Sequence, residues 1–229
     1  MIYILGGIDL VPTHHENEIA QNKGMCGKIP ARFWMHCEFL LIDGGKMSKS
    51  LGNAYLVDDI IEKGYEPLSY KMLCFTSHYR NKLNFTWDAL ESAQNALNRL
   101  REGYRKHLNG EEEISDEEIS KLKASFLEAI NDDLNIPASM SIVWSIVKNP
   151  IKSKKLANLL LDFDRVLGLN IDKKVETIDL PEEILKIVEE RKKAREEKNW
   201  VKSDELRDKL QTMGYIVKDS KEGMKVEKK

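Results

Sequence analysis

The most distinctive stretch of the sequence is a loop rich in lysine and serine, Lys46-Met47-Ser48-Lys49-Ser50-Leu51-Gly52-Asn53. Lys46 and Lys49 place two ammonium groups three residues apart, and nearby glycines leave the backbone free to move. A lysine is a compact charge on a flexible stem, which suits the binding of phosphate groups. The pattern indicates a mobile clamp that acts most strongly where negative charge develops during phosphate transfer. A short K-x-x-K pattern is also typical of a solvated basic turn.

A second group with chemical potential is His14-His15-Glu16-Asn17-Glu18. His14 and Glu18 are four residues apart, so on a helix their side chains share one face. Neutral imidazole and carboxylate are both ligands of zinc. The pattern therefore predicts either part of a metal site or, more simply, a polar start to a helix.

Short strands and turns must position both groups. The stretch from Ile2 to Asp9 is apolar and ends at a glycine turn, which is typical of a buried strand in a parallel sheet. We expect a helix from His14 to about Gln21. Residues 33–42 have the pattern of a strand, and Asp43-Gly44-Gly45 predicts the turn before the lysine loop.

From about Asp58 the sequence predicts helices. One long helix carries an apolar stripe, at steps of three and four residues, formed by Leu90, Ala93, Leu97, Leu100, Tyr104 and Leu108. Ser115 and Glu118 form a capping-box pattern for the next helix, and Gly168 is placed to end a later one. Residues 169–180 have the polar character of a linker. Pro181 then opens a helix pair that ends at Gly214, and a weak hairpin follows.

Composition excludes several classes of protein. The 229 residues are 41% hydrophobic and 32% charged, which is typical of a globular, helix-rich chain. No apolar run approaches the roughly 18 residues that a membrane span needs, and we see no secretory leader. Three scattered cysteines do not indicate a disulfide framework, so we expect a cytoplasmic protein. The net charge of −2 does not indicate nucleic-acid binding by itself.

The two chemical groups, read with their neighbours, resemble one family. The lysine loop resembles the KMSKS loop of class I aminoacyl-tRNA synthetases. Gly6-Gly7-Ile8-Asp9-Leu10, followed by the histidine segment and Ile19-Ala20-Gln21, resembles the corresponding segment of cysteinyl-tRNA synthetases. Further similar segments extend along nearly the whole chain, namely 33–36, 77–80, 83–85, 131–138, 194–208 and 214–219.

This resemblance implies roles for individual residues. Lys46 and Lys49 would hold the ATP phosphates while an aminoacyl-adenylate forms. His14 and Glu18 would bind zinc, which takes up the thiolate of the substrate cysteine and discriminates against serine. The nucleoside of ATP, bound with Mg, would lie against three further residues, Gly7, Asp9 and His36.

The resemblance also implies a tRNA surface for the tRNA that bears the cysteine anticodon. Candidate contacts are four arginines, Arg80, Arg191, Arg195 and Arg207. Between Glu189 and Lys209 there are eight basic and seven acidic residues, a balance that is typical of an ordinary exposed helix pair. Charge alone therefore does not indicate tRNA binding at these helices.

The sequence departs from the family pattern at its start. The HIGH motif and two upstream zinc-binding cysteines of the family are not in the sequence, and residues 1–5 and 11–13 follow the pattern loosely. We therefore expect a C-terminal portion that neither forms adenylate nor charges tRNA alone. In an alternative interpretation, the chain is a module that pairs with a separately encoded N-terminal half, for which an exposed sheet edge would be the docking surface.

The expected fold is mainly α. Residues 1–57 would form the C-terminal remnant of a Rossmann-like α/β catalytic domain, 58–170 an antiparallel helical bundle that contacts the tRNA stem, and 171–229 a small α+β anticodon-binding module. The function that we expect is cysteine–tRNA ligation. Alternatives are a non-catalytic tRNA-binding or assembly subunit of a split synthetase, and a related ligase that joins cysteine to a small amine.

Overall fold

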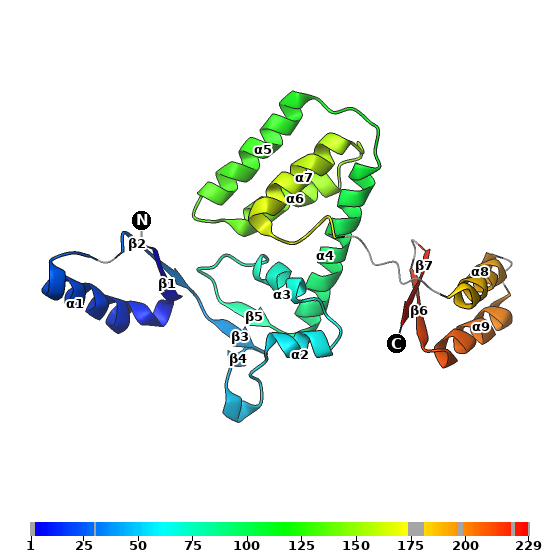
Figure 1. Cartoon of the computed structure of the whole chain (residues 1–229), viewed down its shortest axis with the longest axis horizontal. Coiled ribbons are helices and arrows are strands. Elements are labelled where there is room, and N and C mark those ends of the chain that lie inside the picture. Colours follow the sequence, from blue (N-terminus) through cyan, green and yellow to red (C-terminus); the bar gives the residue numbers. More distant parts are fainter. Residues whose placement is uncertain (1–2, 30, 174–180, 197–198, 221–222, 229) are drawn as a thin grey trace. The chain divides into compact units, whose positions relative to one another are not determined.

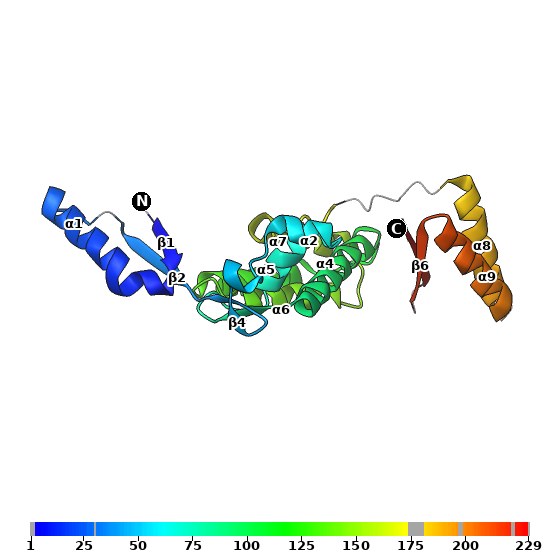
Figure 2. The ribbon, with the colours of Figure 1, turned by 90° about the horizontal axis from the view of Figure 1, so that it is seen from below.

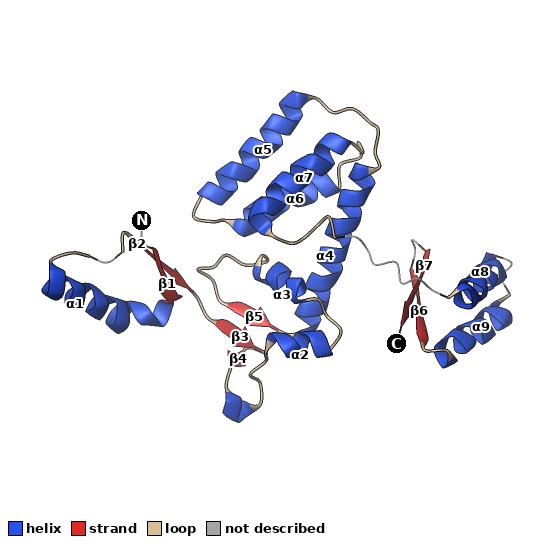
Figure 3. Ribbon diagram, viewed as in Figure 1, coloured by secondary structure: helices blue, strands red, loops and turns tan. Residues whose placement is uncertain are grey.

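The structure is a computed structural model that describes residues 3–29, 31–173, 181–196, 199–220 and 223–228. It is mainly helical with small sheets, as expected (Figures 1 and 3). The contacts between residues divide the chain into two compact units, 1–173 and 174–229. None of the helices in the described ranges is both long enough and apolar enough to cross a membrane.

The first unit begins with a β–α–β arrangement. Strand β1 (Tyr3–Gly7) pairs in parallel with β2 (Phe33–Cys37), and the register places Gly6 opposite His36. Between the strands the chain forms a 3-10 turn, η1 (Ile8–Leu10), a π-helical turn, η2 (Val11–His15), and helix α1 (Glu16–Cys26). The helix expected from His14 therefore starts two residues later, because residues 11–15 adopt the wider π turn.

The strand expected over residues 33–42 is divided between two sheets. After β2, the chain forms β3 (Leu40–Ile42), which pairs antiparallel with β4 (Gly45–Lys46) and in parallel with β5 (Leu83–Phe85). The turn predicted at 43–45 is found at residues 43 and 44, since Gly45 already begins β4. This second sheet carries the lysine loop.

A single apolar core joins this sheet to the helices. It includes Ile42 and Phe85 of the sheet and the inner faces of the helices α2 (Val57–Glu62), α3 (Pro67–Cys74) and α4 (Trp87–Leu108). The stripe predicted on α4 is buried from Leu90 to Tyr104. Leu108 was predicted to belong to it but is 42% exposed, because α4 ends there and the chain turns away.

Three further helices complete the bundle, namely α5 (Asp116–Asn131), α6 (Ile136–Val147) and α7 (Lys154–Leu167). Two of them, α6 and α7, pack against α4, and α5 packs against these two (Figures 1 and 2). The predicted start of α5 is confirmed, since the Glu118 amide donates to the Ser115 hydroxyl over 3.2 Å. Gly168 ends α7 in the left-handed region at a φ of 60°, as expected.

The core of the first unit extends beyond residue 168. Leu169 and Ile171 were expected in a linker, but they are 0% and 2% exposed. The rest of that predicted linker, 174–180, lies outside the described residues. The second unit contains α8 (Glu182–Glu196), α9 (Trp200–Thr212) and the hairpin of β6 (Tyr215–Ser220) with β7 (Gly223–Lys228).

Candidate functional site

The lysine loop is fixed at its base by a side chain from β5. Asn84 accepts a hydrogen bond from the Gly44 amide over 2.7 Å through its Oδ1 atom. Gly44 and Gly52, which bound the loop, have φ angles of 78° and 68°, in the left-handed region that favours glycine. The start of the loop, at Gly44, is therefore hydrogen-bonded to β5.

Asn53 closes the loop from the other side. Its Oδ1 accepts from the Ser48 amide over 2.8 Å, and its Nδ2 donates to the Lys46 carbonyl over 3.1 Å. The side chain of Met47 points inward and lines an apolar cavity of about 270 Å³ next to core residues such as Ile42 and Phe85. Met47 thus anchors the loop to the apolar core of the first unit.

The two lysines lie on the other side of the loop. Lys46 is in β4 and Lys49 is in the 3-10 turn η3 (Lys49–Leu51), and both are exposed. Within the described part of the chain, neither ammonium group has an ion-pair partner. This arrangement leaves both charges available to an anionic ligand, while Met47 and Asn53 restrict the backbone.

Replacing Asn53 tests how the loop is closed. In Asn53→Ala the Ser48 amide loses its acceptor, and one neutral hydrogen bond contributes about 1 kcal/mol. We expect amide exchange at Ser48 to become about fivefold faster, measured by hydrogen exchange and NMR. Asn53→Asp keeps an acceptor oxygen for Ser48 and should retain most of the protection. Equal exchange in Asn53→Ala and the unmodified chain would contradict this role.

The candidate metal ligands do come together. The Nε2 atom of His14 lies 3.5 Å from Oε1 of Glu18, and their side chains are 60% and 38% exposed. His14 belongs to the π turn η2 and Glu18 to the first turn of α1. Both atoms therefore face solvent at one spot, where a cation could bind.

His15, which the sequence analysis did not select, connects this spot to the strands. It is 5% exposed, and its Nδ1 lies at hydrogen-bonding distance, 2.8 Å, from Nε2 of His36. Its ring also packs on Trp34, with the ring centroids 4.9 Å apart. A Cβ atom on Gly6 would lie 2.7 Å from the ring of His15, so this approach requires glycine. The only sequence signal for His15 was its place beside His14.

The residues expected at the nucleoside lie on the same β–α–β arrangement. Gly7 ends β1, Asp9 is in η1, and His36 is in β2 beside β1. His36 thus lies beside the candidate metal ligands, because it contacts His15, the neighbour of His14. Among the described residues, no hydrogen bond or ion pair joins these positions to Lys46 or Lys49.

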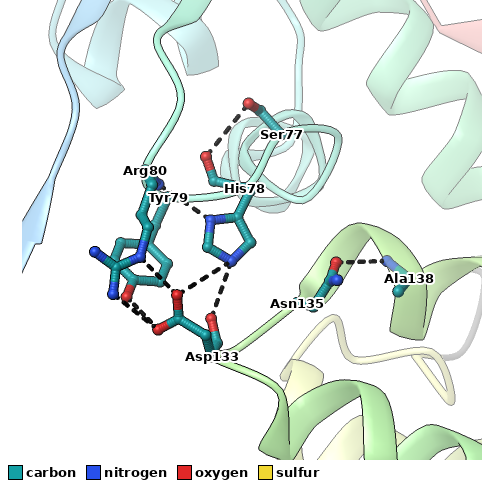
Figure 4. A network of polar contacts seen from close by, with 7 residues as sticks. All are labelled: Ser77, His78, Tyr79, Arg80, Asp133, Asn135 and Ala138. Atoms are coloured by element: carbon teal, nitrogen blue, oxygen red, sulfur yellow. Dashed lines mark hydrogen bonds and ion pairs between the residues drawn. The ribbon is translucent and has the colours of Figure 1, made fainter.

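Arg80 is part of a polar network rather than a free cation. Its Nε and Nη2 atoms donate to the two carboxylate oxygens of Asp133 over 2.6 and 3.1 Å, and the Tyr79 hydroxyl donates to the same carboxylate (Figure 4). His78 Nε2 lies 3.0 Å from the Asp133 carbonyl. The hydrogen bonds from Arg80 and Tyr79 lower the pKa of Asp133 to about 2.

This network joins two segments that are far apart in the sequence. Residues 77–80 follow α3, while Asp133 lies in the turn between α5 and α6 and has a φ of 52°. Asn135, two residues later, caps α6 by accepting from the Ala138 amide. The network therefore holds the connection before β5 to the start of α6, and a phosphate at Arg80 would compete with Asp133.

Three of the expected tRNA contacts lie in the second unit. Arg191 of α8 is 1% exposed and donates from Nε to the Ser203 carbonyl of the α9 segment, so its burial argues against a direct phosphate contact. Arg195 is partly buried. Arg207 is exposed and pairs with Asp204 over 3.2 Å. Of these three, Arg207 presents the most accessible charge.

Two family models match the chain. Residues 2–95 match the catalytic domain of class I (C) tRNA synthetases, and residues 177–226 match the cysteinyl-tRNA ligase anticodon binding domain. A solved structure of an Agrobacterium radiobacter K84 agnB2 LeuRS, in a ternary complex with tRNA and LeuAMS, has a similar fold. Its TM-score is 0.54 with 14% identity, over 73% of this chain and 25% of that one.

Curated relatives of similar sequence are named cysteine–tRNA ligases. One from Burkholderia lata is 38% identical over 223 residues, which are 96% of this chain and 46% of the relative. Others are from Protochlamydia amoebophila (37% over 240 residues, 98% and 50%) and Chlamydia felis (38% over 239 residues, 97% and 50%). The chain spans about half the length of the curated relatives that it matches.

Proposed function

We propose that the chain, which is similar over nearly its whole length to cysteine–tRNA ligases, supplies the phosphate-binding loop and the tRNA-binding part of an enzyme that activates cysteine with ATP and transfers it to tRNA. The observation that carries this proposal is the lysine loop, whose two lysines are exposed. The loop lies within the segment that matches a class I synthetase catalytic domain, and the same chain also matches an anticodon-binding domain. The reaction would take place in the cytoplasm, in agreement with three free cysteines.

In this proposal, Lys46 and Lys49 bind the phosphates of ATP, which enters with Mg. As the α-phosphate is attacked by the cysteine carboxylate and pyrophosphate leaves, negative charge grows on the phosphate oxygens that the ammonium groups face. Anchoring of the loop by Asn53 and Asn84 limits the reorganisation needed at that moment. Gly7, Asp9 and His36 would lie at the nucleoside.

His14 and Glu18 would hold zinc. Their ligand atoms, 3.5 Å apart, are close to the separation of about 3.4 Å that two ligands have on a tetrahedral zinc with bonds near 2.05 Å. When bound, zinc would take a thiolate far better than a hydroxyl, which discriminates cysteine from serine. Because His14 is 60% exposed, a substrate has access to this position.

A second polypeptide that carries the HIGH motif would complete the active site. The exposed apolar side chains of β1 and β2 support docking of this polypeptide on the strand pair. Parallel sheets are normally covered on both faces, and here Tyr3, Leu5 and Phe33 are 61%, 68% and 45% exposed. The partner would add strands to this pair and cover these side chains.

Binding of tRNA by the chain alone tests the tRNA-binding part of the proposal. We expect a tRNA with the cysteine anticodon to bind at least tenfold more tightly than the same tRNA with a changed anticodon, measured by fluorescence anisotropy at one stated salt concentration. Arg207→Ala should weaken binding of both tRNAs. Equal affinity for the two anticodons would contradict an anticodon-reading role.

A further inference from the structure

Residues 79–85, which we call the bridging segment, form a hydrogen-bonded ribbon with the chain that leads to the lysine loop. The carbonyl of Tyr79 accepts a hydrogen bond from the Glu38 amide over 2.9 Å. The amide of Leu83 donates to the Phe39 carbonyl over 3.2 Å, and β5 then continues the ribbon by pairing in parallel with β3. The bridging segment therefore runs beside the chain that enters the lysine loop.

One end of the bridging segment holds the start of the lysine loop. The Asp43 amide donates to the Phe85 carbonyl over 3.0 Å, and the Gly44 amide donates to Oδ1 of Asn84 over 2.7 Å. The loop follows directly, with Lys46 already in β4. A displacement of the bridging segment would therefore move the point from which the lysine loop starts.

The other end of the bridging segment is fixed by the carboxylate of Asp133 (Figure 4). Arg80 donates to this carboxylate twice, over 2.6 and 3.1 Å, and the Tyr79 hydroxyl donates to it over 2.5 Å. The ring of His78, which directly precedes the segment, contacts the carbonyl of Asp133 over 3.0 Å. Because neighbouring residues share one partner, Asp133 restrains the backbone of the segment as well as its side chains.

The backbone at Asp133 has a conformation that few residues adopt. Asp133 and Leu134 have φ angles of 52° and 54°, both in the left-handed region. A bulky residue such as leucine is an outlier there, and outliers persist only where the surrounding structure fixes their geometry. The contacts of Asp133 with the bridging segment help to fix it. Backbone outliers of this kind cluster at functional sites, where the position of one side chain matters.

We infer that Asp133 is a positioning residue for the lysine loop, and that it acts through the bridging segment and Asn84. Its carboxylate sets the position of residues 79 and 80, and the ribbon transmits that position to residue 84. The Asn84 side chain then places the Gly44 amide, and with it the start of the loop. The effect on the loop is a property of this chain alone, whereas its consequence for a reaction rests on the proposed function.

Amide exchange at Gly44 in the purified chain tests this inference without any assay of activity. Asp133→Asn keeps the shape of the side chain but removes its charge, which weakens the contacts with Arg80. We expect exchange at Gly44, measured by NMR, to become about threefold to tenfold faster, the range typical of coupling through a network of contacts. The control is Asp162→Asn, which removes a carboxylate that pairs with Lys123 over 2.7 Å and should leave exchange at Gly44 unchanged. Unchanged exchange in Asp133→Asn, or equal acceleration in the control, would overturn the inference.

A double variant separates positioning from a general loss of stability. Asn84→Ala removes the acceptor of the Gly44 amide and should by itself make exchange there faster. Adding Asp133→Asn should then have no further effect, because the connection to the loop is already broken. An additional, additive acceleration would show that Asp133 acts through overall stability, which would overturn the inference.

A milder variant decides the question if Asp133→Asn does not fold. Tyr79→Phe removes a single hydroxyl from the network and should make exchange at Gly44 about twofold faster. Unchanged exchange in this variant would then count against the positioning role.

Kinetics separate the inference from the proposed function. In the chain combined with the HIGH-motif half, Asp133→Asn should lower kcat for adenylate formation and leave KM for ATP nearly unchanged, because the loop lysines act on charge that grows in the transition state. If exchange at Gly44 becomes faster but kcat does not fall, the positioning of the loop is supported and its proposed role in the reaction is wrong. If the mixture activates cysteine but neither exchange nor kcat responds to the variant, the inference alone is wrong.

Discussion

Replacing both Lys46 and Lys49 by alanine is expected to slow adenylate formation by a factor of about 10² or more, in the chain combined with a polypeptide that supplies the HIGH-motif half. Loss of one preorganised contact to developing charge commonly lowers the catalytic rate by about 10²–10³. The effect should appear mainly in kcat rather than in KM for ATP, because the charge that the ammonium groups stabilise grows in the transition state. Pyrophosphate exchange dependent on cysteine measures both constants.

A matched control is Lys82→Ala. Lys82 is exposed like the two loop lysines, and it lies just before β5 rather than on the loop. Its removal lowers the charge of the first unit but leaves the loop intact. Equal slowing by Lys82→Ala would show that general charge, rather than the loop, supports the reaction.

The largest effect on stability is expected at Glu66, the partner of a buried arginine. Arg101 has a side chain 6% exposed, and its Nη1 and Nη2 atoms donate to the Glu66 carboxylate over 2.6 and 2.9 Å. Arg101 also donates to the carbonyls of Leu169 and Asn170, which fixes the end of the first unit. Glu66→Gln leaves a buried charge without its counter-ion, so we expect unfolding to require about 3 kcal/mol less free energy in urea titrations.

The same pair predicts how stability depends on pH. The hydrogen bond from Arg101 holds the pKa of Glu66 below its ordinary value of 4.5, although burial opposes this. The contribution of Glu66 to stability is therefore fully present above that ordinary value and is lost as pH falls toward the lowered pKa. Glu66→Gln should remove this part of the acid dependence.

The surface pair of Glu102 and Lys106 supplies the comparison. Glu102 lies 3.0 Å from Lys106 and is 39% exposed, so Glu102→Ala should change the free energy of unfolding by less than about 1 kcal/mol. If Glu66→Gln is no more destabilising than Glu102→Ala, the buried pair does not hold the unit together.

Elements that depend on local sequence could be predicted well. The apolar stripe of α4, the Ser115 cap of α5 and the glycine that ends α7 follow from periodicity, a hydroxyl at the N-cap and a residue free to adopt positive φ. The position of the lysine loop between two glycine turns was equally clear from the sequence.

Features that depend on distant partners could not be predicted. The loop is held by Asn84, which is 40 residues from Gly44, and Arg80 is neutralised by Asp133, which is 53 residues away. Arg191 looked like a surface charge in a balanced helix, yet the packing of α8 on α9 buries it. His15 was overlooked because a π turn, rather than a regular helix, directs it toward His36.

The most direct test of the account is whether this chain is required for activation of cysteine. The HIGH-motif half, alone and combined with this chain, would be assayed for exchange of pyrophosphate into ATP with cysteine or serine as the amino acid. We expect exchange only when both polypeptides and cysteine are present. Equal exchange without this chain, or with serine in place of cysteine, would contradict the account.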